Sequence, residues 1–91
     1  MAIDNPYLPS VFVSNPVQDR RRKNLGIVLR ELERDGVESS LLVDQVLGMR
    51  TGTLADVRKG ADITDVMARE IEWSMNRPPG WLDRGTSGDG I

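Results

Sequence analysis

The residues of this chain that are best suited to chemistry lie in one short run of small, polar and basic side chains, Gly48-Met49-Arg50-Thr51-Gly52-Thr53. Hydroxyls and a guanidinium form hydrogen bonds with polar groups, and glycines let a partner approach the backbone closely. A second run, Arg20-Arg21-Arg22-Lys23, places four positive charges in consecutive positions. These residue types predict binding of a polar, negatively charged partner.

The composition excludes most catalytic chemistry. The 91 residues include no histidine and no cysteine, so the chain has no histidine general base, no cysteine nucleophile, no disulfide and no zinc-finger ligand set. Carboxylates cluster over 31–44 and 62–72, and we interpret them as solvated helix faces because no pair suggests acid–base catalysis. We expect no enzymatic activity, no metal site, no cofactor and no small-molecule substrate.

The charge balance and the hydropathy narrow the class of protein further. A net charge of −2 argues mildly against nucleic-acid binding, although a small acidic protein can still carry one basic face. No apolar run approaches the roughly 20 residues that cross a bilayer, and the N-terminus lacks the pattern of a signal peptide. We therefore expect a cytoplasmic protein without a membrane partner.

Helix start and stop signals predict one all-α domain over 15–83, between an irregular arm over 1–14 and a disordered tail over 84–91. The first helix begins at Asn15-Pro16-Val17-Gln18, where Asn15 caps and Gln18 reaches back as in a capping box. It ends at Asp35-Gly36, because glycine accepts the left-handed conformation that often follows a helix.

A later helix begins at Thr64 and must end near Arg77, because Pro78 disfavours helical geometry before it. Trp81 and Leu82 then fold back as a plug. Apolar spacing along all the predicted helices assigns an inward face. The residues of that face are Leu25, Val28, Leu29, Leu32, Leu42, Val43, Val46, Leu47, Leu54, Ala55, Val57, Ala68, Ile71 and Met75.

Two shorter helices, joined by a tight turn, are predicted between the long ones. Ser39 or Ser40 caps the first, which stops at Gly48, and Thr51 caps the second, which stops at Gly60. Helices joined so closely cross steeply, and the second can project into a groove of DNA. The expected fold is therefore a compact bundle of four to five short helices that contains a helix-turn-helix at about 39–59.

Each basic or polar group has a structural alternative to a contact with DNA. Positive charge over Arg20–Lys23 lies near the positive end of the helix macrodipole, which costs roughly 0.3–1 kcal/mol of stability per group. This cost favours a contact with phosphate over a face that is merely solvated. The run Arg50–Thr53 either reaches base edges and phosphates or only forms a turn and a cap. Arg58 and Lys59 lie where a helix C-terminus attracts positive charge, so the structural interpretation is stronger for them.

Four pieces of sequence resemble the lambda-repressor-like family of helix-turn-helix regulators, the Cro/cI or XRE type of phages and bacteria. They are Arg21-Arg22-Lys23-Asn24-Leu25, the run Gly48-Met49-Arg50-Thr51-Gly52-Thr53-Leu54, Lys59-Gly60 as a helix stop, and Ala68-Arg69-Glu70-Ile71-Glu72 followed by Pro78-Pro79-Gly80-Trp81-Leu82-Asp83. The last piece is the most specific, and the match covers about 20–83.

The resemblance implies a sequence-specific transcriptional regulator, a small phage or prophage protein of the Cro or repressor type, in the cytoplasm of a bacterial or phage-infected cell. Its partners would be double-stranded operator DNA and a second copy of the chain, because one short recognition helix reads too few base pairs. Dimer contacts are expected from the apolar arm over 7–13 and from the segment around Trp73, Trp81 and Leu82. The alternative for the arm is that it folds back on its own domain or is disordered. The candidate DNA-binding residues are Arg20, Arg21, Arg22, Lys23, Ser39, Ser40, Arg50, Thr51, Gly52, Thr53 and Arg58.

Two departures from the family pattern favour a different class, a protein-interaction module such as an antirepressor or accessory subunit. Ser39 or Ser40 stands where the family usually has a glutamine that touches phosphate. Asp44 stands where the family usually has a small alanine, at a position that packs against the third helix. The acidic balance points the same way, whereas the two basic clusters favour DNA.

Overall fold

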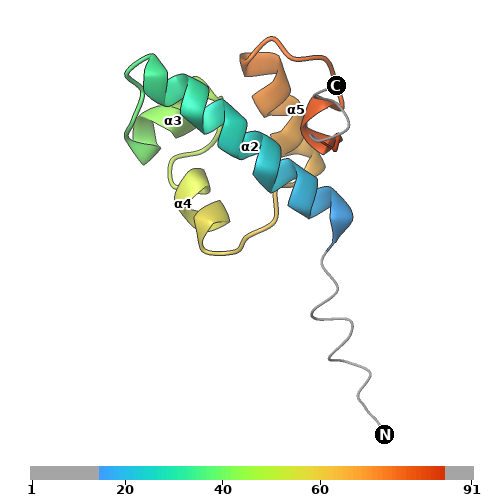
Figure 1. Cartoon of the computed structure of the whole chain (residues 1–91). Helices are drawn as coiled ribbons and strands as arrows, with labels where there is room; N and C mark the ends of the chain where they lie inside the picture. The colour runs from blue at the N-terminus through green and yellow to red at the C-terminus, as the bar shows by residue number, and fades with distance from the viewer. Residues whose placement is uncertain (1–14, 86–91) are drawn as a thin grey trace, which may run out of the picture.

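The computed structural model describes residues 15–85. Its longest element is helix α2 (Pro16–Arg34), which runs across the domain (Figure 1). The predicted N-cap of α2 is confirmed, because the Asn15 Oδ1 atom accepts hydrogen bonds from the backbone N–H of Val17 at 3.0 Å and of Gln18 at 3.4 Å. Asn15 thereby satisfies donors that have no partner inside the helix. The helix ends at Arg34 with Asp35 as its C-cap, and Gly36 follows with φ of 91°.

Three further helices and one 3₁₀ turn pack around α2. They are α3 (Ser40–Val46), α4 (Thr53–Arg58), α5 (Asp65–Ser74) and η1 (Trp81–Asp83). Of the two residues predicted to cap α3, Ser39 and not Ser40 is the cap, because its hydroxyl accepts from the N–H of Leu42 at 3.1 Å. The predicted cap Thr64 is confirmed, because its hydroxyl accepts from the N–H of Met67 at 3.2 Å. Over 15–85 the protein is a small all-helical domain without strands, which confirms the all-α class.

Helix α5 ends three residues earlier than predicted. It stops at Ser74, and Asn76 adopts a positive φ of 57° that closes the last turn through a hydrogen bond from Arg77 N to Glu72 O at 2.8 Å. This left-handed closure satisfies a terminal carbonyl before Pro78 is reached. The predictions for the arm over 1–14 and for 86–91 in the tail lie outside the described residues.

The core lies between α2 and the other four elements, and it is built of leucine, valine, isoleucine and alanine. Two residues predicted to face inward, Leu42 and Val46, are instead 48% and 42% exposed, and the buried apolar residues of α3 and its C-cap are Val43 and Leu47. The buried apolar residues are Leu25, Val28, Leu32, Val43, Leu47, Leu54, Val57, Ile63, Ala68, Ile71 and Leu82.

Candidate functional site at the turn between α3 and α4

The turn between α3 and α4 is shaped by two glycines in the left-handed region. Gly48 has φ of 72° and Gly52 has φ of 93°. Gly48 also lies against α5, since an added Cβ would be 2.9 Å from the Glu70 Oε2 atom. Gly52 is the N-cap of α4 and has no side chain to offer, so the prediction that Thr51 caps this helix is wrong.

The missing cap is supplied by a buried carboxylate on the preceding helix. Asp44 is 1% exposed, and its two oxygens accept hydrogen bonds from Gly52 N at 2.7 Å and from Leu54 N at 2.9 Å. These bonds satisfy free N–H groups at the beginning of α4, where negative charge also suits the helix dipole. Asp44, which from the sequence alone is an unfavourable charge at a position that packs against α4, therefore stabilises the turn.

The predicted contact residues form two groups at opposite ends of the α3–α4 pair. Arg50 and Thr51 are exposed at the turn, beside the half-buried Gly52 and Thr53. At the other end the Arg58 Nη1 atom donates to Ser40 Oγ at 3.2 Å, next to the exposed Ser39. The length of α3, about 10 Å from its rise per residue, separates the two groups. Both remain accessible to a partner.

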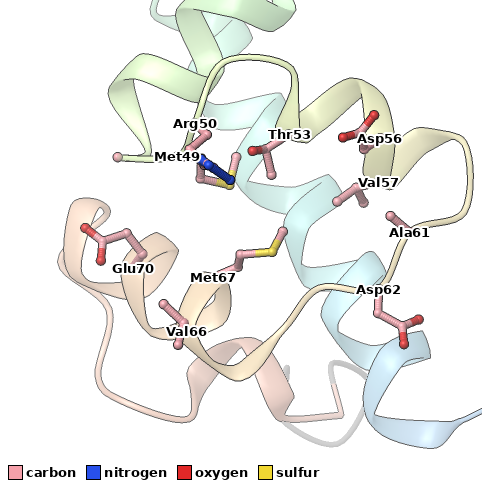
Figure 2. A pocket seen from close by; sticks show the side chains of 11 residues that line it. Met49, Arg50, Thr53, Asp56, Val57, Ala61, Asp62, Val66, Met67 and Glu70 are labelled. Carbon is pink, nitrogen blue, oxygen red and sulfur yellow. The ribbon is translucent and has the colours of Figure 1, made fainter.

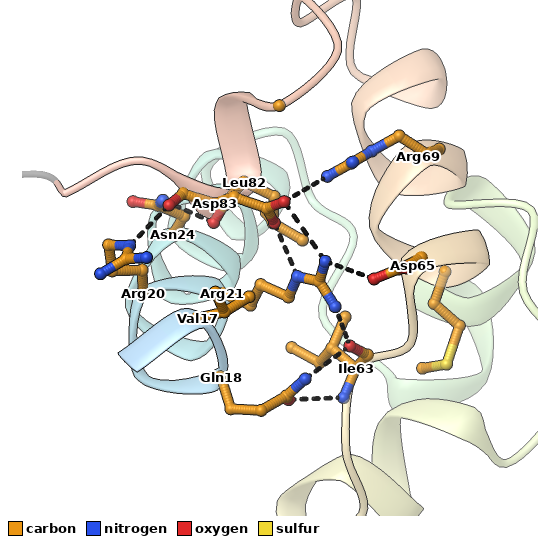
Figure 3. Close-up of polar contacts among 12 residues, drawn as sticks. Val17, Gln18, Arg20, Arg21, Asn24, Ile63, Asp65, Arg69, Leu82 and Asp83 are labelled. Carbon is orange, nitrogen blue, oxygen red and sulfur yellow. Dashed lines mark hydrogen bonds and ion pairs between the residues drawn. The ribbon is translucent and has the colours of Figure 1, made fainter. Parts of the chain in front are cut away.

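The basic run at the start of α2 has a different role from the one predicted. Arg21 is 4% exposed, and its guanidinium donates to Asp83 Oδ1 at 2.6 Å, to Ile63 O at 2.6 Å and to Asp65 Oδ1 at 2.7 Å (Figure 3). A buried side chain with these partners cannot also contact a phosphate. The assignment of Arg21 to the DNA backbone is therefore corrected.

The neighbours of Arg21 are also engaged within the domain. The Arg20 Nε atom donates to Asp83 O at 2.6 Å, and Arg22 donates to Val57 O at 2.8 Å and to Ala61 O at 2.7 Å. The Val57 carbonyl lies in the last turn of α4, where positive charge is favourable, so the charge of Arg22 is accommodated within the domain. Lys23 is exposed and is the member of this run that points to solvent.

Asp83 is the centre of a cluster that we call the clasp, made of Arg21, Asn24, Arg69, Glu72 and Asp83. The guanidinium of Arg21 lowers the pKa of Asp83, and a second hydrogen bond, from Arg69 Nη2 at 3.0 Å, acts in the same direction. Asn24 is buried and donates through Nδ2 to the Leu82 and Arg84 carbonyls at 2.8 and 2.9 Å. The clasp therefore fastens η1 onto α2 (Figure 3).

Gln18 also differs from its predicted role. Its side-chain amide pairs with the backbone of Ile63, donating to the carbonyl at 2.9 Å and accepting from the N–H at 2.8 Å. It therefore does not reach back to Asn15 as in a capping box. Instead it joins the beginning of α2 to the segment before α5, 45 residues later in the chain.

An open hollow of about 350 Å³ lies between α4, the turn and α5. Figure 2 shows Met49 and Met67 projecting into this space from the turn and from α5. Its apolar lining is completed by Val57, Ala61 and Val66. Its polar lining consists of Arg50, Thr53, Asp56, Asp62 and Glu70, so the hollow adjoins the exposed end of the turn.

The residues that sequence reasoning missed are the buried carboxylates Asp44 and Glu72. Each precedes a left-handed glycine by eight residues and a buried leucine by ten, as in Asp44, Gly52 and Leu54. This shared spacing is visible in the sequence and could have indicated the role of the two carboxylates. It can be interpreted only in the structure, where both backbone N–H groups donate to the carboxylate.

Over 15–85 no group of acidic residues is arranged to hold a metal ion, and no helix there is both long and apolar enough to traverse a bilayer. No protein-family model, no curated protein and no solved structure matches this chain.

Proposed function

We propose that this chain binds duplex DNA as a sequence-specific transcriptional regulator, with α3 and α4 acting as a helix-turn-helix and α4 entering the major groove. The observation that supports the proposal most is the start of α4. There Asp44 holds the backbone from inside, while Arg50 and Thr51 are exposed outside. A recognition helix needs this combination of a rigid backbone and accessible polar side chains.

The candidate contacts divide into those that read bases and those that touch phosphates. Arg50 and Thr53 flank the start of α4 and are the proposed base-reading side chains, with Gly52 allowing close approach. Ser39, Ser40 and Arg58 lie together at the far end of the α3–α4 pair and are proposed to contact phosphates. Of the basic run in α2, Lys23 keeps this role.

The chain is also proposed to act as a homodimer in the bacterial cytoplasm, as a small phage or prophage regulator of the Cro or repressor type. Pairing two chains doubles the number of base pairs that are read. Trp73, which is 81% exposed, is available for such a contact. Leu82 is fully buried, and Trp81 is half-buried with the Arg77 Cζ atom 4.3 Å from its ring centre. We therefore propose no dimer contact for these two residues.

The test is fluorescence anisotropy with labelled duplexes selected from a random pool, at several salt concentrations. We expect saturable binding with two chains per duplex by analytical ultracentrifugation. The Arg58→Ala variant should bind all sequences more weakly and reduce the salt slope by about one, whereas Arg50→Ala should change the preference between sequences by about 1–3 kcal/mol.

Arg84→Ala is the matched control, because Arg84 is exposed and directly follows η1, which lies on the other side of α2 from α4 (Figure 1). It removes the same charge and should leave both quantities unchanged. An absence of DNA affinity at low salt would overturn the proposal, and so would a loss in Arg84→Ala equal to that in Arg58→Ala.

A second candidate function is a protein-interaction module on the same fold. The observation that favours it is the outer face of α3, where Leu41 is 61% exposed, Leu42 48% and Val46 42%. Contiguous apolar side chains on a small domain commonly mark a protein contact. This candidate would take precedence if the duplexes failed to bind while Leu41→Ser abolished capture of a protein partner.

A further inference from the structure

The hollow between α4 and α5 combines an apolar floor with an acidic rim. The floor is formed by Met49, Val57 and Met67, and methionine side chains adapt their shape readily to a bound apolar group. Val66 stands at the edge and is 76% exposed. A site of this kind accepts a bulky apolar side chain from a partner.

The rim carries three carboxylates, from Asp56, Asp62 and Glu70, and one guanidinium, from Arg50. Within the described part of the chain, none of the three carboxylates takes part in an ion pair. The arginines that do form ion pairs there, Arg21, Arg69 and Arg77, are paired with other carboxylates. The rim therefore keeps an excess of negative charge that faces solvent. A partner that brings positive charge would be attracted to it.

We propose that the hollow is a docking site for a peptide segment of another protein, in which a large apolar side chain is flanked by lysine or arginine. The apolar group fills the space between Met49 and Met67, and the basic flanks lie against Asp62 on one side and Glu70 on the other. The partner is assigned by charge complementarity, because an acidic or neutral segment would leave the rim carboxylates uncompensated.

One consequence follows for regulation, and this consequence alone rests on the proposed DNA-binding function. Arg50 and Thr53 line the hollow and are also proposed to read bases. A docked segment covers them, so segment and duplex compete. Docking itself does not depend on DNA, so it can be measured whether or not the duplexes bind.

The experiment uses two fluorescein-labelled peptides with the same Leu-Phe-Leu centre, one flanked by lysines and the other by glutamates. The protein carries ¹³C-methyl methionine. We expect the lysine peptide to bind at least about tenfold more tightly than the glutamate peptide, as a few exposed charge contacts allow. The methyl signals of Met49 and Met67 should shift, whereas that of Met75, which packs on the core away from the hollow, should not.

Variants test the contributions of the charged rim and of the apolar lining to binding separately. Asp62→Asn combined with Glu70→Gln should weaken the lysine peptide about threefold to tenfold, and Asp35→Asn, at the exposed end of α2, should leave it unchanged. Val66→Ser, which makes the apolar edge of the hollow polar without adding a charge, should weaken both peptides, and it should not unfold the domain because Val66 is exposed.

Equal affinity for the two peptides, or no shift of Met49 and Met67 at millimolar peptide, would overturn the proposal. Shifts of these signals with protein concentration in the absence of peptide would assign the hollow to a second copy of the chain instead. A response of the same signals to serine substitutions at Val11 and Phe12 would assign it to the N-terminal segment. Either result would also overturn the proposal.

Discussion

The turn from α3 to α4 and the turn from α5 to η1 are built by the same device. In each, a buried carboxylate on the first helix accepts hydrogen bonds from a glycine N–H and a leucine N–H. Asp44 accepts at 2.7 and 2.9 Å, and Glu72 accepts from Gly80 at 3.0 Å and from Leu82 at 2.8 Å. The two glycines have nearly identical backbone angles, φ of 93° and 91° with ψ of −6°.

The first helix also ends alike in both turns. The fourth residue after the carboxylate has a positive φ, 72° at Gly48 and 57° at Asn76, and the fifth donates to the carbonyl of the carboxylate residue at 2.8 Å. The sequences in between, Gly48-Met49-Arg50-Thr51 and Asn76-Arg77-Pro78-Pro79, are unrelated. The buried carboxylate and these backbone hydrogen bonds therefore determine the geometry of the two turns more than the side chains of the turn residues do.

The two turns differ in what surrounds the carboxylate. Glu72 has Arg69 beside it, with Nη2 3.1 Å from Oε2, and Arg69 continues to Asp83 and so to Arg21. Asp44 has no ion-pair partner among the residues that the structure describes. The α5–η1 turn is thus fastened into a network, whereas the α3–α4 turn depends on one carboxylate, and its one basic residue, Arg50, forms no ion pair within the described residues. This division suits a structural turn and a binding turn.

The largest effect is expected from breaking the network at Arg21. Arg21→Ala leaves Asp83 with fewer partners and empties a buried position, so we expect a loss of about 3–5 kcal/mol in the free energy of unfolding, measured by urea denaturation. Arg30→Ala, which removes an exposed charge from the same helix, should change it by less than about 0.5 kcal/mol. Similar values for the two variants would show that the clasp does not hold η1 on α2.

A smaller effect is expected from neutralising the two carboxylates. An amide keeps one acceptor and loses the other, so Asp44→Asn and Glu72→Gln should each cost about 1–3 kcal/mol in urea denaturation. Glu72→Gln should cost more, because Arg69 also loses a charged partner.

The same pair sharpens the functional comparison. Below the temperature at which either variant unfolds, Asp44→Asn should weaken discrimination between duplex sequences, and Glu72→Gln should leave it unchanged. Equal effects on discrimination would mean that the two turns are not divided into a binding turn and a structural turn.

The smallest effect is a dependence of stability on pH. Arg21 lowers the pKa of Asp83 below its ordinary value of 3.8, so folding favours the ionised carboxylate. The corresponding stability is fully present above pH 3.8 and is lost as the pH falls through the lowered pKa of the folded state. The difference in unfolding free energy between the natural chain and Asp83→Asn should therefore shrink on acidification from pH 7. A difference independent of pH would contradict the assigned pairing.

The sequence by itself determined where three of the four described helices, α2, α3 and α5, begin, and which class of fold they make. Asn15, Ser39 and Thr64 cap as predicted because a cap bonds to N–H groups only two or three residues away, within reach of local pattern. The absence of histidine and cysteine likewise needs no structure to be read. DNA binding, dimerisation and the Cro-like role remain proposals that the residues suggest.

Only the tertiary structure decided what the charged residues do. Arg21 and Lys23 are basic residues of the same run in α2, but Arg21 has its partner Asp83 62 residues away, and packing buries Arg21 while it leaves Lys23 exposed. Asp44 is an unfavourable charged residue when α3 is considered alone, but in the folded domain it caps α4. The energy of a charged group depends on which donors and acceptors surround it after folding, and segments distant in the chain supply them.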